Sequence, residues 1–258
     1  MTDVLATEFA KLRRSAVPWV SGGVIVVAVL GAALLVWIVR DPERAASLCL
    51  LGTKANLAGL EATWPAFGTY ISVIAGAGGM LLLAFIATYL FGREYDDDTS
   101  KNLLGLPVPR WRFVVAKLVV ALVWWSALVA LLLVTGFAVG TALQLPGHST
   151  DTIAGTVGTT LVAAAASFLL APVIAWITIA TRSYLAALGF ALGMLLVGNL
   201  IGHTGWAEWF PWSIVPAVTA MSGAGTTGLP WTSYLVLVLT FGAGTAGAVH
   251  RLVHADNP

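Results

Sequence analysis

Charged side chains are scarce in this sequence of 258 residues, since Asp, Glu, Lys and Arg together make up 10% of it. A soluble globular domain carries about 25% charged residues, so this chain cannot cover a water-facing surface of its own. The net charge of +1 also gives no basic excess for binding nucleic acid. Lipid is therefore the expected surrounding of most of the chain, and nucleic acid is not an expected partner.

Residues that carry catalytic or metal chemistry are also few. Cys49 is the single cysteine, which excludes a disulfide or a cysteine-based metal site within one chain. The four histidines are scattered along the sequence, so we expect no metal site. Ser222 and His203 are the one pair that could act as nucleophile and base, but both lie in a segment where Gly and Ser are common turn residues. We therefore expect no catalytic residues and no enzyme activity in this chain.

Long apolar runs are what the sequence has instead, with 59% hydrophobic residues and a mean hydropathy of +0.90. A helix needs about 20 mainly apolar residues to cross a membrane. The runs lack the period of two that a barrel strand requires. The sequence thus predicts an all-α integral membrane protein, a single transmembrane domain over 1–258, with six transmembrane helices at 18–39, 64–91, 113–145, 153–181, 184–201 and 232–250.

The distribution of Lys and Arg predicts the orientation. With the N-terminus inside, ten of the thirteen basic residues fall on inner segments and three on outer ones. Cytoplasmic loops carry the excess of Lys and Arg, so both termini are expected in the cytoplasm. The first apolar run could instead belong to a signal peptide, but it is longer than a typical signal core.

The residues before the first run form a helical pattern over 3–16. Leu5, Phe9 and Leu12 fall on one face, whereas Lys11 and Arg14 fall opposite. This pattern predicts an amphipathic helix in the cytoplasmic interface; the alternative is an ordinary basic flank that sets the topology. The expected interfacial residues are Leu5, Phe9, Lys11, Leu12, Arg13 and Arg14.

Two connections differ from simple loops. The segment between the second and third runs holds the densest charge of the chain, and Pro107 ends its helical pattern. It predicts a short cytoplasmic helix over 93–106, which is either a docking surface for a soluble partner or a solvated loop. The segment 203–231 is rich in Trp, Gly and Pro and predicts an outer interfacial or re-entrant segment.

The charged loop and the start of the third run carry the residues Arg93-Glu94-Tyr95, Thr99, Lys101, Leu104, Pro107, Arg110 and Lys117. This pattern resembles the loop between spans two and three of ABC-2-type transporter permeases. The N-terminal Glu8-Phe9-x-Lys11-Leu12-Arg13-Arg14 and the turn Thr181-Arg182-Ser183 resemble two further parts of that family. Asp98 and Pro109 depart from the family pattern, which favours Gly and Ser there. Short loops and overall length look most like the bacitracin-resistance, lantibiotic-immunity and drug-export branch.

The resemblance implies a permease of a bacterial cell membrane that pairs with a second copy or a sister permease. Two cytoplasmic ATP-binding-cassette ATPase subunits would bind beneath, and ATP and Mg would bind to those subunits, with no cofactor in this chain. Such a permease would export an amphiphilic compound, such as a drug, a peptide antibiotic or a lipid-like molecule. The coupling residues implied by the resemblance are Arg93, Glu94, Tyr95, Thr99, Lys101, Arg182 and Tyr184.

By the same resemblance, the second and fifth spans would line a cargo path. Small residues are ordinary in helix interfaces, so helix packing is the alternative role for each residue on that path. The expected path residues are Thr69, Ser72, Gly76, Gly79, Met194 and Asn199.

Ionisable residues are nearly absent between the ends of the apolar runs. Ion-coupled transporters usually place carboxylates or histidines there to carry the coupling ion. Energy for uphill transport is therefore expected from another subunit. An ion-driven secondary transporter and a non-transporting membrane scaffold remain the alternative functions.

Overall fold

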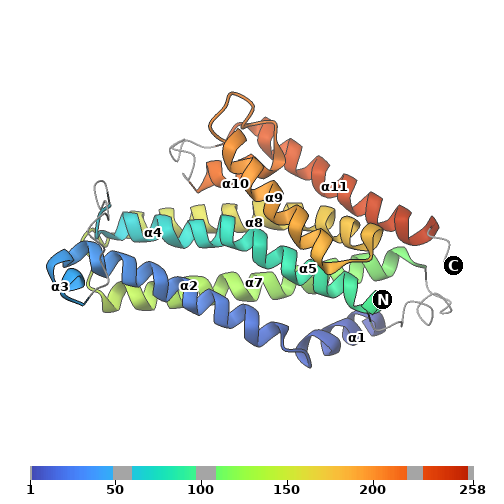
Figure 1. Ribbon diagram of the computed structural model, residues 1–258, viewed down its shortest axis with the longest axis horizontal. Helices are drawn as coiled ribbons and strands as arrows, with labels where there is room; N and C mark the ends of the chain where they lie inside the picture. The colour runs from blue at the N-terminus through green and yellow to red at the C-terminus, as the bar shows by residue number, and fades with distance from the viewer. Residues whose placement is uncertain (1, 49–59, 97–108, 220–228, 255–258) are drawn as a thin grey trace.

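The computed structural model describes residues 2–48, 60–96, 109–219 and 229–254. Within these ranges the chain is helical, with short connections between the helices (Figure 1). Six helical segments are long and apolar enough to cross a membrane, which confirms the predicted all-α integral membrane protein. The six are α2 (Val17–Arg40), the continuous unit α4 (Trp64–Val73), η1 (Ile74–Gly78) and α5 (Gly79–Asp96), α7 (Trp111–Ala142), α8 (Thr150–Thr181), α9 (Tyr184–Ile201) and α11 (Trp231–His254).

Three shorter helices accompany the spans: α1 (Thr2–Arg13), α3 (Pro42–Ser47) and α10 (Pro211–Val218). α1 lies at the end of the bundle where α11 finishes, which we call the terminal end. α3 and the connection between α7 and α8 lie at the opposite end, which we call the distal end (Figure 1). α10 and the connection before it occupy part of the predicted segment 203–231. Most of the predicted helix 93–106 lies outside the described residues, although α5 continues to Asp96.

Polar side chains fix the start of three spans. Thr63, Ser149 and Ser183 each accept a hydrogen bond from a backbone N–H three residues later, and so cap α4, α8 and α9. Arg182 ends α8 in a left-handed conformation with φ of 52°. Because only Ser183 separates this residue from α9, the chain reverses direction abruptly between the fourth and fifth spans.

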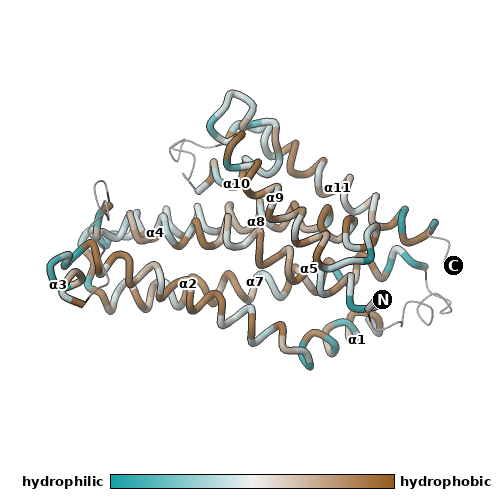
Figure 2. The backbone as a smooth tube through the Cα atoms, viewed as in Figure 1, coloured by the Kyte–Doolittle hydropathy of each residue, from teal (hydrophilic) through white to brown (hydrophobic). Residues whose placement is uncertain are grey.

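α8 forms the centre of the bundle, where it packs against α11, α5, α4 and α9. The second and fourth spans are mostly buried within the chain, whereas α2, α9 and α11 expose apolar faces. Val27 of α2 and Leu196 of α9 are 68% and 61% exposed. Figure 2 shows brown, apolar backbone along much of α2 and in stretches of α9 and α11. In an integral membrane protein such faces meet lipid or another membrane protein.

The second span contains a π-helical segment, η1, between α4 and α5. A π-helix holds one extra residue per turn and leaves backbone carbonyls without their usual partners. The Ser167 hydroxyl of α8 lies 3.1 and 3.4 Å from the carbonyl oxygens of Gly76 and Ala75, and 2.9 Å from that of Ala163 in its own helix. A Cβ atom at Gly76 would lie 2.7 Å from Thr219, and one at Gly79 would lie 2.7 Å from the Trp125 ring. The glycines therefore allow neighbouring helices to approach the widened turn closely.

Candidate functional site

A buried ion pair joins three helices at the terminal end. Glu8 of α1 is almost fully buried, and its carboxylate lies 3.4 Å from the Lys117 ammonium of α7. The partly exposed Lys11 donates to the same carboxylate at 2.7 Å. Lys117 also donates to the backbone carbonyl of Leu90 in α5. A single buried cluster thus connects α1 with the ends of the second and third spans.

The charge state of Glu8 follows from this cluster. Burial raises the pKa of its carboxyl, but the ammonium groups of Lys117 and Lys11 outweigh burial and hold that pKa below its ordinary value of 4.5. Glu8 is therefore ionised at neutral pH. A buried pair of this kind is strongly destabilised when one partner is removed, since the other charge then stays in a poorly solvated place.

A second contact closes the terminal end. The Arg110 guanidinium, just before α7, donates to the carbonyls of Leu252 and Val253 at 2.9 Å each. These carbonyls belong to the last turn of α11, where backbone acceptors lack partners within the helix. Arg110 thereby fastens the beginning of the third span to the end of the sixth.

The structure brings two of the predicted coupling regions together. The ring of Tyr184, at the start of α9, packs on Gly92, where a Cβ atom would come within 2.8 Å of the ring. Arg93 follows directly and donates to the Tyr89 hydroxyl at 3.1 Å. Arg182 is exposed beside them. Thr99, Lys101 and the side chains of Glu94 and Tyr95 lie outside the described residues, so their predicted roles stay predictions.

A helix, α1, is present where the interfacial helix was predicted, and part of its predicted apolar face packs against α7. Leu12 is buried and Leu5 half-buried against α7, but Phe9 is 40% exposed. Glu8 takes the inward position between Leu5 and Leu12 because Lys117 offers it a counter-charge. Lys11 is half-buried in its contact with Glu8, and Arg13 and Arg14 are exposed. Sequence reasoning missed Glu8, although an isolated lysine within the third apolar run signals a buried acidic partner.

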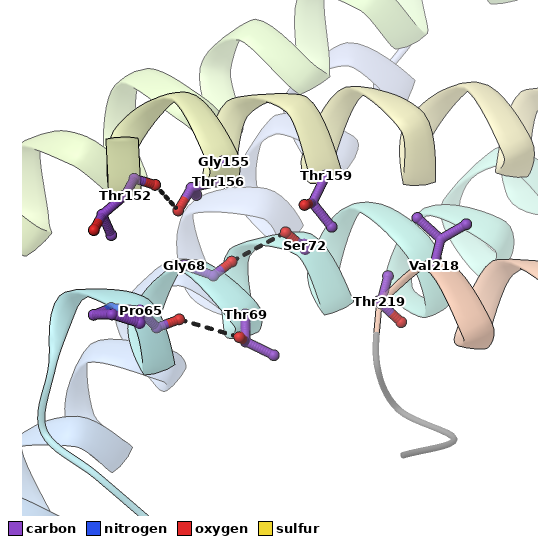
Figure 3. Close-up of a pocket in the computed structure, with 10 residues that line it drawn as sticks. All are labelled: Pro65, Gly68, Thr69, Ser72, Thr152, Gly155, Thr156, Thr159, Val218 and Thr219. Atoms are coloured by element: carbon purple, nitrogen blue, oxygen red, sulfur yellow. Dashed lines mark hydrogen bonds between the residues drawn. The ribbon is translucent and has the colours of Figure 1, made fainter. Parts of the chain in front are cut away.

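A cavity of about 450 Å³ lies at the distal half of the bundle, between α4, α8 and the end of α10 (Figure 3). Among the described residues its lining carries no charged side chain, and six of the ten lining residues bear a hydroxyl group. Thr69 and Ser72, both expected on the cargo path, are part of it. Ser72 also shares a 3.1 Å hydrogen bond with Thr160, which joins α4 to α8. The lining residues are Pro65, Gly68, Thr69, Ser72, Thr152, Gly155, Thr156, Thr159, Val218 and Thr219.

The other predicted path residues lie elsewhere. Gly76 and Gly79 sit in close helix contacts, Met194 packs against the apolar cluster around Trp212, and Asn199 is half-buried on α9. The threonines that α8 adds to the cavity were not expected. Their spacing of three to four residues, at 152, 156 and 159, places them on one helix face and was the available signal.

Comparison with known proteins identifies the family of this chain. A family model described as ABC-2 family transporter protein matches residues 4–198, which include most of α1, the first four spans and most of the fifth. The bacitracin transport permease protein BCRB of Bacillus licheniformis is 31% identical over 137 residues, which is 53% of this chain and 66% of that protein. The matched part thus spans just under two thirds of the relative. Because the family model covers most of the chain, this integral membrane protein belongs to the ABC-2 family of transporter proteins.

Proposed function

We propose that the chain is the permease subunit of an exporter, driven by ATP that a separate subunit hydrolyses. The observation that carries this proposal is the family match over residues 4–198. The scarcity of ionisable residues within the spans supports an energy source outside this chain. ATP and Mg would then bind to the partner subunits.

In this proposal the terminal end faces the cytoplasm. The excess of Lys and Arg on the segments of that end supports this orientation, so both chain termini would be cytoplasmic. ATPase subunits would dock at the terminal end, which carries α1, the end of α5 and the turn between α8 and α9 (Figure 1). Arg93, Tyr184 and Arg182 lie at that end.

The Glu8–Lys117 pair would transmit movement from the docked ATPase to the spans. A push on α1 displaces Glu8, and separating a buried carboxylate from a buried ammonium is costly. The third span would therefore follow α1. The second span would follow as well, because Lys117 also holds the Leu90 carbonyl. Glu8 is thus a positioning residue that connects the docking surface to the transport path.

A second copy of the chain, or a sister permease, would pack on the exposed apolar faces of the outer helices. The fifth span is mostly exposed, which suits a place at such an interface. The cargo would be amphiphilic, because a path through apolar spans with few charges disfavours a strongly charged solute. The bacitracin transport named for the relative supports this class of cargo.

The test is co-expression with candidate ATPase subunits, purification in mild detergent, and ATPase and export assays in proteoliposomes. We expect a stable complex whose ATPase activity depends on the permease. Glu8→Gln should leave the complex assembled but lower export relative to ATP hydrolysis, because the neutral side chain weakens the link to Lys117. Arg13→Gln, on the exposed side of the same helix, is the matched control. Export by the Glu8→Gln protein at the wild-type ratio to ATP hydrolysis would exclude the transmission role.

A further inference from the structure

The side chains that line the distal cavity determine which chemical groups it can bind. Cavities of 300–1,000 Å³ accommodate small-molecule groups, and this one holds about 450 Å³. No charged side chain lines it among the described residues. Five of the ten lining residues, Thr69, Ser72, Thr152, Thr156 and Thr159, are hydroxyl-bearing residues of α4 and α8 (Figure 3).

The hydroxyl protons of this lining are largely committed to the protein backbone. Thr69 donates to the Pro65 carbonyl at 3.1 Å, and Ser72 donates to the Gly68 carbonyl at 3.1 Å (Figure 3). Each of these bonds joins a side chain to the carbonyl four residues earlier in its own helix. A serine or threonine in this arrangement gives up its one donor but keeps acceptor lone pairs.

The same pattern continues on the other walls of the cavity. Thr156 donates to the Thr152 carbonyl at 2.9 Å, and Thr219 donates to the Pro216 carbonyl at 3.1 Å. Thr159 has no hydrogen-bond partner among the described residues. The hydroxyls of Thr69, Thr156 and Thr219 therefore present acceptors to a bound molecule, and a ligand has to supply the donors. The Ser72 hydroxyl is already shared with Thr160.

Charge near the cavity acts in the same direction. Asp151 is exposed in the first turn of α8, directly before the lining residue Thr152. A carboxylate in this position attracts cations and repels anions. An anionic head group such as a phosphate would meet acceptors and a nearby negative charge, with no lysine or arginine in the described lining to offset them.

We infer that this cavity binds the donor-bearing polar group of an amphiphile, such as an ammonium, amide or hydroxyl group, and excludes anionic head groups. The inference rests on the proposed transport function, for which it names the chemical class of the cargo group. The hydroxyl lining of α4 and α8 would recognise the N–H or O–H donors. In the proposed orientation the cavity lies in the outer half of the membrane, where an exported molecule is released.

Two glycines of α8 provide a matched pair for the test. Gly155 lines the cavity and Gly158 does not, yet a Cβ atom at either position would meet no atom within 4 Å. Gly155→Leu should therefore fill the cavity, whereas Gly158→Leu adds the same side chain outside it. Both changes replace a helix-interior glycine, so their effects on helix stability should be similar.

The experiment is photolabelling of the full-length chain in lipid nanodiscs. Two probes carry the same diazirine-bearing alkyl chain, one with a primary ammonium head and one with a phosphate head. Labelled peptides are mapped by mass spectrometry, and labelling of the lipid-exposed Val27 region corrects for partition of each probe into the bilayer. The expected result is labelling of the α4 and α8 cavity segments by the ammonium probe, at least fivefold above the phosphate probe. Gly155→Leu should abolish it and Gly158→Leu should retain it.

Equal labelling by both probes would overturn the donor preference, and cavity labelling that survives Gly155→Leu would overturn the site. The assay needs neither ATP nor an ATPase subunit. Loss of export with cavity labelling intact would therefore count against the proposed function alone. Unchanged export with no cavity labelling would count against this inference alone.

Discussion

The two ends of the bundle use opposite kinds of polar chemistry. The terminal end buries two charged side chains, Glu8 and Lys117, and the stability of their ion pair depends on both partners staying in place. The distal end holds a cavity lined by neutral hydroxyl groups, most of them bonded to their own helices. An ion pair between two helices links them strongly. A hydroxyl that donates to a carbonyl of its own helix contributes little to folding, but its oxygen can still accept a hydrogen bond from a ligand.

This contrast suggests a division of work along the membrane normal. Rigid links suit the end that receives a mechanical input, because they convert movement of one helix into movement of its neighbours. Weakly committed acceptors suit the end that binds and releases a molecule, because a bound donor displaces no internal hydrogen bond. The contrast leads to predictions that differ in size from one end to the other.

The largest effect is expected for Lys117→Met. The change leaves the buried Glu8 carboxylate with Lys11 alone, and removing one partner of a buried pair costs about 3–5 kcal/mol. The midpoint of unfolding in an SDS titration of mixed micelles should fall accordingly. The double variant Glu8→Gln/Lys117→Met should recover part of the loss, since no unpaired charge remains. A midpoint equal to that of the Arg13→Gln control would contradict the role of the pair.

A smaller loss is expected for Gly68→Ala at the distal end. A Cβ atom at Gly68 would overlap the Thr156 side chain, and overpacking of this kind costs about 1–3 kcal/mol. Thr156→Ala should relieve the overlap, so the double variant should be more stable than Gly68→Ala by itself. The same SDS titration measures both. Simple addition of the two losses would show that the residues do not touch.

Arg110→Gln should have a local effect of about 1 kcal/mol, because two charge-assisted bonds to α11 are lost from a place that is partly exposed. Hydrogen exchange should quicken in the last turn of α11 and stay unchanged in α9. Arg112→Gln is the control, since the Arg112 guanidinium lies over the Trp111 ring. Faster exchange spread over the whole bundle would instead indicate global destabilisation.

Acid should weaken the terminal end before the distal end. The pKa of Glu8 is lowered in the folded protein, so the pair contributes its full stability above the ordinary value of 4.5 and loses it as pH falls through the lower folded value. The stability difference between wild type and Glu8→Gln, which removes the titrating carboxyl, should be constant from neutral pH down to 4.5. It should shrink only at more acidic pH, and a difference that shrinks near neutral pH would contradict the lowered pKa.

The smallest folding effect is expected for Thr159→Val. The Thr159 hydroxyl makes no hydrogen bond to any described residue, so its loss should change stability by less than about 0.5 kcal/mol. Labelling of the cavity by the ammonium probe should nevertheless drop at least twofold. A variant with wild-type labelling would place the donor-recognising hydroxyls on the other lining residues.

Length and hydropathy were sufficient to predict six spans, because only a helix satisfies the backbone of a long apolar run in lipid. The ion pair was beyond reach, since Glu8 and Lys117 lie far apart in the sequence and pattern does not reveal which helices pack together. Thr69 and Ser72 were singled out on family resemblance, but the α8 threonines were not, because hydroxyls in membrane helices usually bond their own backbone.

The π-helical turn of the second span also changes which residues of the helix lie on the same face. One extra residue in η1 rotates everything after it by about 100° relative to an uninterrupted α-helix. The orientation of α4, which turns Thr69 and Ser72 toward the cavity, therefore differs by this rotation from the orientation of α5, which brings Leu90 to Lys117. Removing a single residue from 74–78 would bring the two halves into one continuous register and leave either the hydroxyls or the Leu90 carbonyl pointing at the wrong neighbour. The span therefore tolerates sequence drift in either half more readily than a change in its length.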